Sequence, residues 1–131
     1  MSWQGKILKI DLTHGAILEE PLNQDWANDY IGERGLGSKY LSEHLDPTVN
    51  PMGPDNVLIF ATGPLTGTSA STSGRYAVLT KGPLTGAIAC SNSGGKFGAE
   101  LKYAGYDLLL VQGKSEKPVY LLIEGDEASL Q

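Results

Sequence analysis

Hydrophobic and polar residues near the N-terminus alternate with the two-residue period of β-strands. Lys6–Asp11 partly alternates, Thr13-His14-Gly15 offers a turn, and residues 16–20 resume the pattern. Because Gly15 can adopt a positive φ, this segment predicts a β-hairpin. Five later runs have the length and apolar content of strands. These runs are residues 57–62, 76–80, 87–90, 107–112 and 118–124.

Three other segments have the features of helices. Asn23 or Asp25 can cap the start of the first segment, and Gly32 can end it. The second has apolar residues at helical spacing and stops before a loop that holds three prolines. The predicted helices are residues 23–31, 35–45 and 96–103. About seven strands and three helices in mixed order predict one α+β domain over residues 1–131, with mixed, mainly antiparallel sheets.

A five-residue sequence occurs twice in the middle of the chain. Gly63-Pro64-Leu65-Thr66-Gly67 recurs without change at residues 82–86, and each copy follows a predicted strand. Proline after glycine presets a tight turn, and the second glycine allows the chain to leave it. The repeat therefore predicts two equivalent hairpin-like corners. An internal duplication is a second interpretation.

Composition and charge exclude several classes of protein. The chain has 131 residues and a formal net charge of −5, so it lacks the basic surface typical of proteins that bind nucleic acid or anionic membranes. No apolar run reaches the ~20 residues that span a bilayer, and the N-terminus lacks an apolar signal core. We therefore expect a cytoplasmic protein with neither nucleic-acid nor membrane partners.

Cysteine and histidine are too scarce to support several kinds of site. Cys90 is the single cysteine, and His14 and His44 are far apart in sequence, so the chain alone cannot build a zinc or iron–sulfur site. Cys90 ends a short apolar run, which favours a buried position. Both histidines have polar neighbours and are expected at the surface.

The strongest local candidate for chemistry is an anion pocket. In the segment Ser91-Asn92-Ser93-Gly94-Gly95-Lys96, small residues expose backbone N–H groups ahead of a predicted helix. Arg75 can add a bidentate contact to a phosphate. The alternative is a glycine-rich helix start that binds nothing, with Arg75 in a surface ion pair. The P-loop and dinucleotide-binding fingerprints both fail here, so a small nucleotide-binding protein is disfavoured.

Further blocks match a known family in their order and spacing. They are residues 5–15, 46–49 (DPTV), 61–68 (ATGPLTGT), 74–76 (GRY), 80–86 (TKGPLTG), 92–95 (NSGG), 97–102 (FGAELK), 104–107 (AGYD) and 113–114 (GK). With these blocks the chain resembles the tungsten-dependent aldehyde ferredoxin oxidoreductase family from Trp3 to about Ile123.

The resemblance implies a cofactor and a reaction. Members of the family oxidise aldehydes to carboxylic acids and pass electrons to ferredoxin. They hold tungsten, or molybdenum in some relatives, between two pyranopterins. A magnesium ion bridges the pterin phosphates, and a [4Fe-4S] cluster lies nearby. Their N-terminal domain, which has two related sheet-containing halves, forms the base for this cofactor.

The resemblance also implies roles for particular residues. Arg75 would contact a pterin phosphate, and Asn92 and Gly94 match the family's phosphate and magnesium contacts. Ser93 and Gly95, in the same glycine-rich segment, complete the candidate cofactor-binding residues. The backbone carbonyl of Asn92 would face the metal.

Family enzymes are several times longer than this chain. The iron–sulfur ligands, the acidic pterin-binding motifs and the proposed catalytic residues lie in later domains, so no catalytic residue is expected here and Cys90 is not a cluster ligand. One hypothesis is the N-terminal, cofactor-holding part of such an enzyme, inactive alone, with the remaining domains, ferredoxin and an aldehyde as partners. The other is a free-standing interaction or assembly subunit that pairs with a partner chain; a homodimer is compatible with both.

Overall fold

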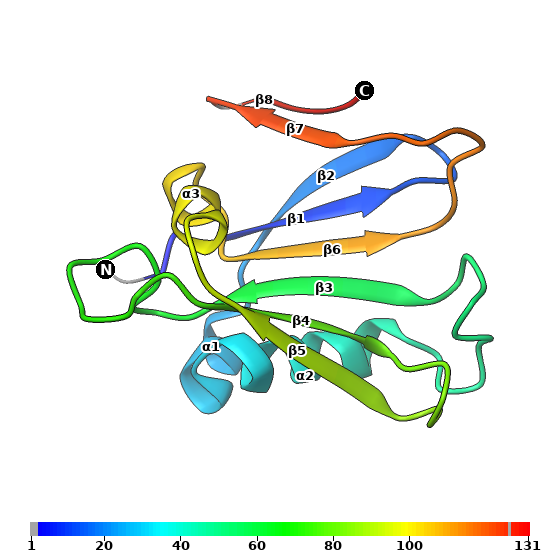
Figure 1. Ribbon diagram of the computed structural model, residues 1–131, viewed down its shortest axis with the longest axis horizontal. Coiled ribbons are helices and arrows are strands. Elements are labelled where there is room, and N and C mark those ends of the chain that lie inside the picture. Colours follow the sequence, from blue (N-terminus) through cyan, green and yellow to red (C-terminus); the bar gives the residue numbers. More distant parts are fainter. Residues whose placement is uncertain (1–2, 126) are drawn as a thin grey trace.

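The computed structural model describes residues 3–125 and 127–131, and its centre is a six-stranded sheet (Figure 1). The strands are β1 (Lys6–Asp11), β2 (Ala16–Pro21), β3 (Val57–Thr62), β4 (Tyr76–Lys81), β5 (Ile88–Ser93), β6 (Leu108–Gln112), β7 (Leu121–Glu124) and β8 (Glu127–Leu130). The helices are α1 (Gln24–Tyr30), α2 (Glu33–His44) and α3 (Phe97–Tyr103).

The strand order in the large sheet is β2-β1-β6-β3-β4-β5. β1 and β6 run parallel, whereas the other neighbours in this sheet are antiparallel. β7 and β8 form a separate antiparallel hairpin. The predicted α+β class with mixed, mainly antiparallel sheets is therefore confirmed. The structure places six strands in one sheet and does not test the interpretation as an internal duplication.

Side chains alternate between two hydrophobic layers. Val57, Ile59 and Ala61 of β3 point toward α1 and α2, which cover one face of the sheet. Phe60, between them in sequence, points to the opposite face, where it packs with α3 and the β7–β8 hairpin. Burial on both faces explains why β3 is an almost continuous apolar run.

Local signals located several element ends correctly. The Asn23 side chain accepts a hydrogen bond from the Trp26 N–H at 3.0 Å and so caps α1, and Gly15 has the expected positive φ of 63°. Each copy of the repeated sequence lies between antiparallel strands, with positive φ at Gly67 and Gly86. The two corners are not equivalent as predicted, because residues 68–75 follow the first copy before β4, whereas the second copy leads almost directly into β5.

Other boundaries differ from the prediction. Residues 91–93 belong to β5, which extends to Ser93 instead of ending at Cys90, because the backbone of β4 pairs with polar residues as readily as with apolar ones. α2 begins two residues earlier than expected, at Glu33. The last predicted strand is shorter and is followed by β8, whose sequence has weak strand signals.

The prediction that Cys90 is buried is wrong. Cys90 lies on β5, the edge strand, where all six residues are exposed. Its register partner Leu79 is fully buried because α2 packs over β3 and β4 but does not reach past β4. His14 is exposed as expected, whereas His44 is half-buried and stacks on Tyr40.

None of the helices in residues 3–125 and 127–131 has the length and apolar character needed to cross a membrane.

Candidate anion-binding site

Arg75 is exposed and directly precedes β4, at the end of a loop rich in serine and threonine. Its guanidinium forms no ion pair with any other described residue. The alternative in which Arg75 serves a surface ion pair therefore has no support among residues 3–125 and 127–131. An exposed arginine without a carboxylate partner can bind an anion.

Gly94 and Gly95 follow β5 and lie beside Arg75. A Cβ built on Gly74 would lie only 2.5 Å from the Gly95 carbonyl oxygen, so glycine at position 74 lets the two loops approach each other. On Gly94 or Gly95, in contrast, a Cβ would meet nothing within 4 Å. Their N–H groups donate no hydrogen bond to another described residue. The two glycine N–H groups are therefore available donors beside open space, and an anion-binding site needs such donors.

These residues border an open surface hollow of about 340 Å³. It is lined by Thr72, Gly74, Arg75, Gly94 and Gly95. The structure therefore brings together Arg75 and the two glycines named from the sequence, which are almost twenty residues apart along the chain. The sequence analysis did not predict Thr72 and Gly74 as site residues. The feature that could have indicated them is the hydroxyl-rich loop that ends at Arg75.

Asn92 and Ser93 occupy different positions from the two glycines. Both belong to β5, where Asn92 is paired with Ala77 and Ser93 with Tyr76. Paired residues point to the same face, so the Asn92 side chain is on the α2 side and the Ser93 side chain is on the other. Neither residue lines the hollow, and any role of Asn92 there rests on its backbone.

A second hollow, of about 350 Å³, lies on another side of Arg75 and Thr72. It is formed by the α1–α2 junction and by the first copy of the repeated sequence, and Glu33 is one of its lining residues. Among the described residues, the three non-glycine positions with positive φ are Ile31, Glu33 and Thr72, and all of them line this hollow. Such conformations cost free energy and cluster at functional sites.

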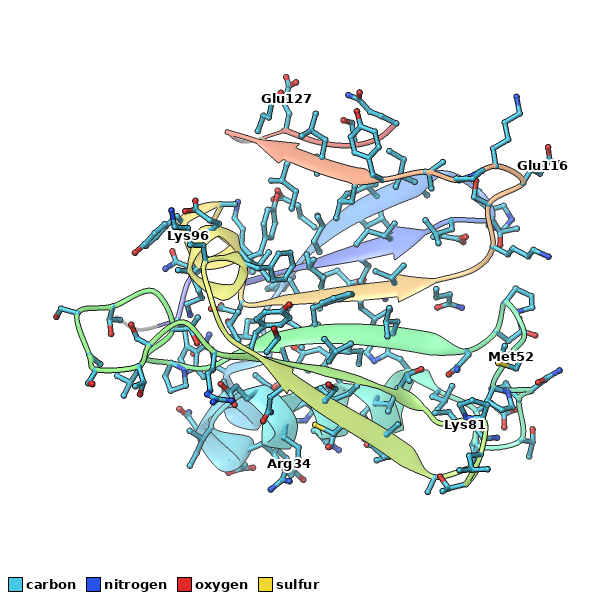
Figure 2. The ribbon with its side chains drawn as sticks, in the orientation of Figure 1. Arg34, Met52, Lys81, Lys96, Glu116 and Glu127 are labelled. Carbon is cyan, nitrogen blue, oxygen red and sulfur yellow. The ribbon has the colours of Figure 1, made fainter. Side chains whose placement is uncertain are left out.

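The charged groups around the site are few. Lys96 follows Gly95 at the start of α3, and Arg34 projects from α2 in the helix layer on the other face of the sheet (Figure 2). α3 has only seven residues, so the anion-binding argument rests on Arg75 and the glycine N–H groups. In residues 3–125 and 127–131, no three His, Cys, Asp or Glu side chains group as metal ligands.

Residues 7–131 match the family described as the aldehyde ferredoxin oxidoreductase N-terminal domain. The chain is 54% identical over 127 residues to the tungsten-containing aldehyde ferredoxin oxidoreductase of Pyrococcus abyssi, a match that covers 97% of the chain and 21% of the relative. It is 35% identical over 133 residues to the aliphatic sulfonate oxidoreductase, WOR-like subunit, of Pyrococcus furiosus, over 99% of the chain and 21% of that relative.

A solved structure has the same fold. It is the active-site complex BamBC of benzoyl coenzyme A reductase in complex with 1,5-dienoyl-CoA. The TM-score is 0.96 and the sequence identity is 39%, over 99% of this chain and 20% of that chain. The chain thus spans about a fifth of the length of the curated relatives it matches.

Proposed function

The chain belongs to the aldehyde ferredoxin oxidoreductase family, and from this membership we propose that it holds the phosphate groups of a tungsten bis-pyranopterin cofactor. The observation that carries the proposal is the hollow in which Arg75 faces Gly94 and Gly95. A guanidinium and free backbone N–H groups are the donors that phosphate oxygens prefer. The open space beside both glycines leaves room for such a group.

The residues of this chain then have positioning roles. Arg75 would bind a phosphate in bidentate fashion, and each charge-assisted hydrogen bond contributes about 1.5–3 kcal/mol. Gly94 and Gly95 would present their N–H groups, and the backbone carbonyl of Asn92 would contribute a ligand to a magnesium ion at the phosphates. The cofactor itself supplies the redox chemistry, with tungsten or molybdenum as its metal.

The complete enzyme, in this proposal, oxidises an aldehyde to a carboxylic acid and passes the electrons to ferredoxin. We expect no catalytic residue in this chain, and the [4Fe-4S] ligands would come from the remaining domains. We propose a cytoplasmic location for the protein and no activity for this chain alone.

Titration of the ¹⁵N-labelled chain with pyrophosphate, followed by NMR, tests the proposal. We expect saturable shifts of the Gly94 and Gly95 amide signals and of the Arg75 Nε–H signal. Arg75→Ala should weaken binding about tenfold or more, the effect of losing one or two charge-assisted bonds. Arg34→Ala removes the same charge from an exposed position and should leave the affinity unchanged. Equal affinity in the Arg75→Ala variant would refute the proposal.

A second candidate is an interaction or assembly subunit. An apolar hollow of about 440 Å³ on the sheet face away from α1 and α2 favours it. Phe60 and Phe97 line this hollow together with β7, and Phe97 remains 43% exposed. Contiguous exposed apolar surface is typical of an interface. The two candidates are compatible, because a domain that holds part of a cofactor must also contact the rest of the enzyme.

A further inference from the structure

The two copies of Gly-Pro-Leu-Thr-Gly give their threonines different surroundings. Both corners turn at a glycine in the left-handed region, with φ of 78° at Gly67 and 68° at Gly86. The hydroxyl of Thr85 accepts a hydrogen bond from the Ala87 N–H at 3.2 Å, within its own exposed corner. Thr66 is only 5% exposed. Thr66 and Thr85 can therefore be compared directly, because they have the same sequence neighbours but different surroundings in the fold.

The Thr66 hydroxyl connects two separate segments. It accepts a hydrogen bond from the Gly63 N–H at 2.9 Å and donates one to the Arg75 carbonyl oxygen at 3.0 Å. Its methyl group lies against α3, where a Cβ on Gly98 would be 3.1 Å from Thr66 Cγ2. Thr66 thus closes the loop that ends at Arg75 and fixes the backbone from which the guanidinium extends.

The corner itself is anchored in the core. Thr62, just before Gly63, donates its hydroxyl to the Asp107 carbonyl oxygen at 2.8 Å and its N–H to the same oxygen at 3.1 Å. Thr62 and Asp107 are fully buried. Two sets of hydrogen bonds, joined by the Thr62–Gly63 peptide bond, therefore link the core through the first corner to the backbone of Arg75.

We propose that Thr66 is a positioning residue for anion binding, because its hydroxyl holds the backbone of Arg75 in the place from which the guanidinium reaches the hollow. The inference rests on the proposed function, and it adds a residue that does not line the hollow shared by Arg75 and the two glycines. Loss of this hydroxyl frees the Arg75 backbone, so the guanidinium must be ordered when the anion binds. Ordering on binding lowers affinity.

The test compares pyrophosphate affinity, by the NMR titration above, in matched variants of the 131-residue chain. Thr66→Val keeps the shape of the side chain but removes the hydroxyl, and it should weaken binding about three- to tenfold, the size of one hydrogen bond. Thr66→Ser retains the hydroxyl and should restore affinity to within about twofold. Thr85→Val makes the same change in the second corner and should have no effect.

The spectra separate positioning from general damage. In Thr66→Val without ligand, the Arg75 Nε–H signal should shift toward its position in a disordered chain, whereas signals from β1 and β6 should not move. With Arg75→Ala already present, Thr66→Val should cause no further loss of affinity. Failure of Thr66→Val and Thr66→Ala to give native spectra would contradict the inference, because Thr66 would then serve the fold.

The experiment distinguishes failure of the positioning role from failure of the proposed function. If Arg75→Ala loses affinity but Thr66→Val does not, the positioning role is wrong and the proposed function stands. If Arg75→Ala keeps full affinity, the proposed function itself is wrong.

Discussion

The Glu19 carboxylate on β2 is exposed, but its pKa depends on contacts that form in the folded state. It accepts a hydrogen bond from the hydroxyl of buried Tyr106 and forms an ion pair with Lys6 at 3.1 Å. The Tyr106 hydrogen bond, followed by Lys6, lowers the pKa of Glu19 below its ordinary value of 4.5. Because the folded-state pKa is lower than the unfolded one, this stabilisation is fully present above pH 4.5 and is lost as pH falls through the folded-state pKa.

We predict that the free energy of unfolding falls less at acidic pH in the Glu19→Gln variant than in the parent chain. Free energies of unfolding from urea titrations, at pH about 7 and at pH about 3, should differ less in the variant than in the parent chain. Glu116→Gln is the control, since Glu116 lies in the exposed β6–β7 loop (Figure 2). An equal fall at acidic pH in Glu19→Gln would show that the Tyr106 contact does not stabilise the fold.

The residues of the candidate site were only partly predictable from the sequence. Arg75, Gly94 and Gly95 were identified because charge and exposed N–H groups are local properties. The position of Thr66 was not, because its sequence neighbours are identical to those of Thr85. Only the tertiary contacts of the first corner distinguish the two threonines.

At the scale of elements, the junction between α3 and β6 depends on a buried ion pair. Lys102 Nζ lies 2.5 Å from an Asp107 carboxylate oxygen, with side-chain exposures of 3% and 0%. The same carboxylate accepts hydrogen bonds from the N–H groups of Gln4 and Gly5, and the Lys102 ammonium lies 4.7 Å from the centre of the Trp3 ring. The pair thus joins α3, β6 and the N-terminal segment.

We predict that Lys102→Met destabilises the fold by about 3–5 kcal/mol, because it leaves the Asp107 charge buried without its cation. Lys39→Met is the matched control. Lys39 pairs with Glu43 one turn away on the surface of α2, where solvent screens the pair, so its loss should cost far less. Urea denaturation at neutral pH measures the free energy of unfolding of both variants. A loss in Lys102→Met no larger than that in Lys39→Met would show that Asp107 is adequately solvated by its backbone donors.

The elements that the sequence predicted well share a local cause. The β1–β2 hairpin, α1 and β3 each have a turn, cap or apolar run within their own residues. β5 was predicted only in part, because its second half pairs with β4 despite having polar side chains. The exposure of Cys90 was likewise missed because it depends on the lateral order of strands, which no local pattern reveals.

At the scale of the whole molecule, the two edges of the large sheet are protected differently. β2 ends in Glu19, Glu20 and Pro21, and both carboxylates form ion pairs with β1. β5, at the other edge, carries neither charge nor proline, and all six of its residues are exposed (Figure 1). Free strand edges pair with other chains unless charge, proline or a covering element prevents it. A bare edge of this kind is therefore open to pairing with a second copy of the chain.

We therefore predict that the isolated chain self-associates at high concentration and that the contact is at β5. Ser91→Lys places a charge on that edge and should lower the apparent mass measured by light scattering. Leu18→Lys places the same charge on exposed β2 and is the control, so both variants change net charge equally. If Leu18→Lys reduces association as much as Ser91→Lys, general charge repulsion is responsible. If the parent chain is a monomer throughout, the exposed β5 edge does not pair with other copies of the chain, and the prediction is wrong.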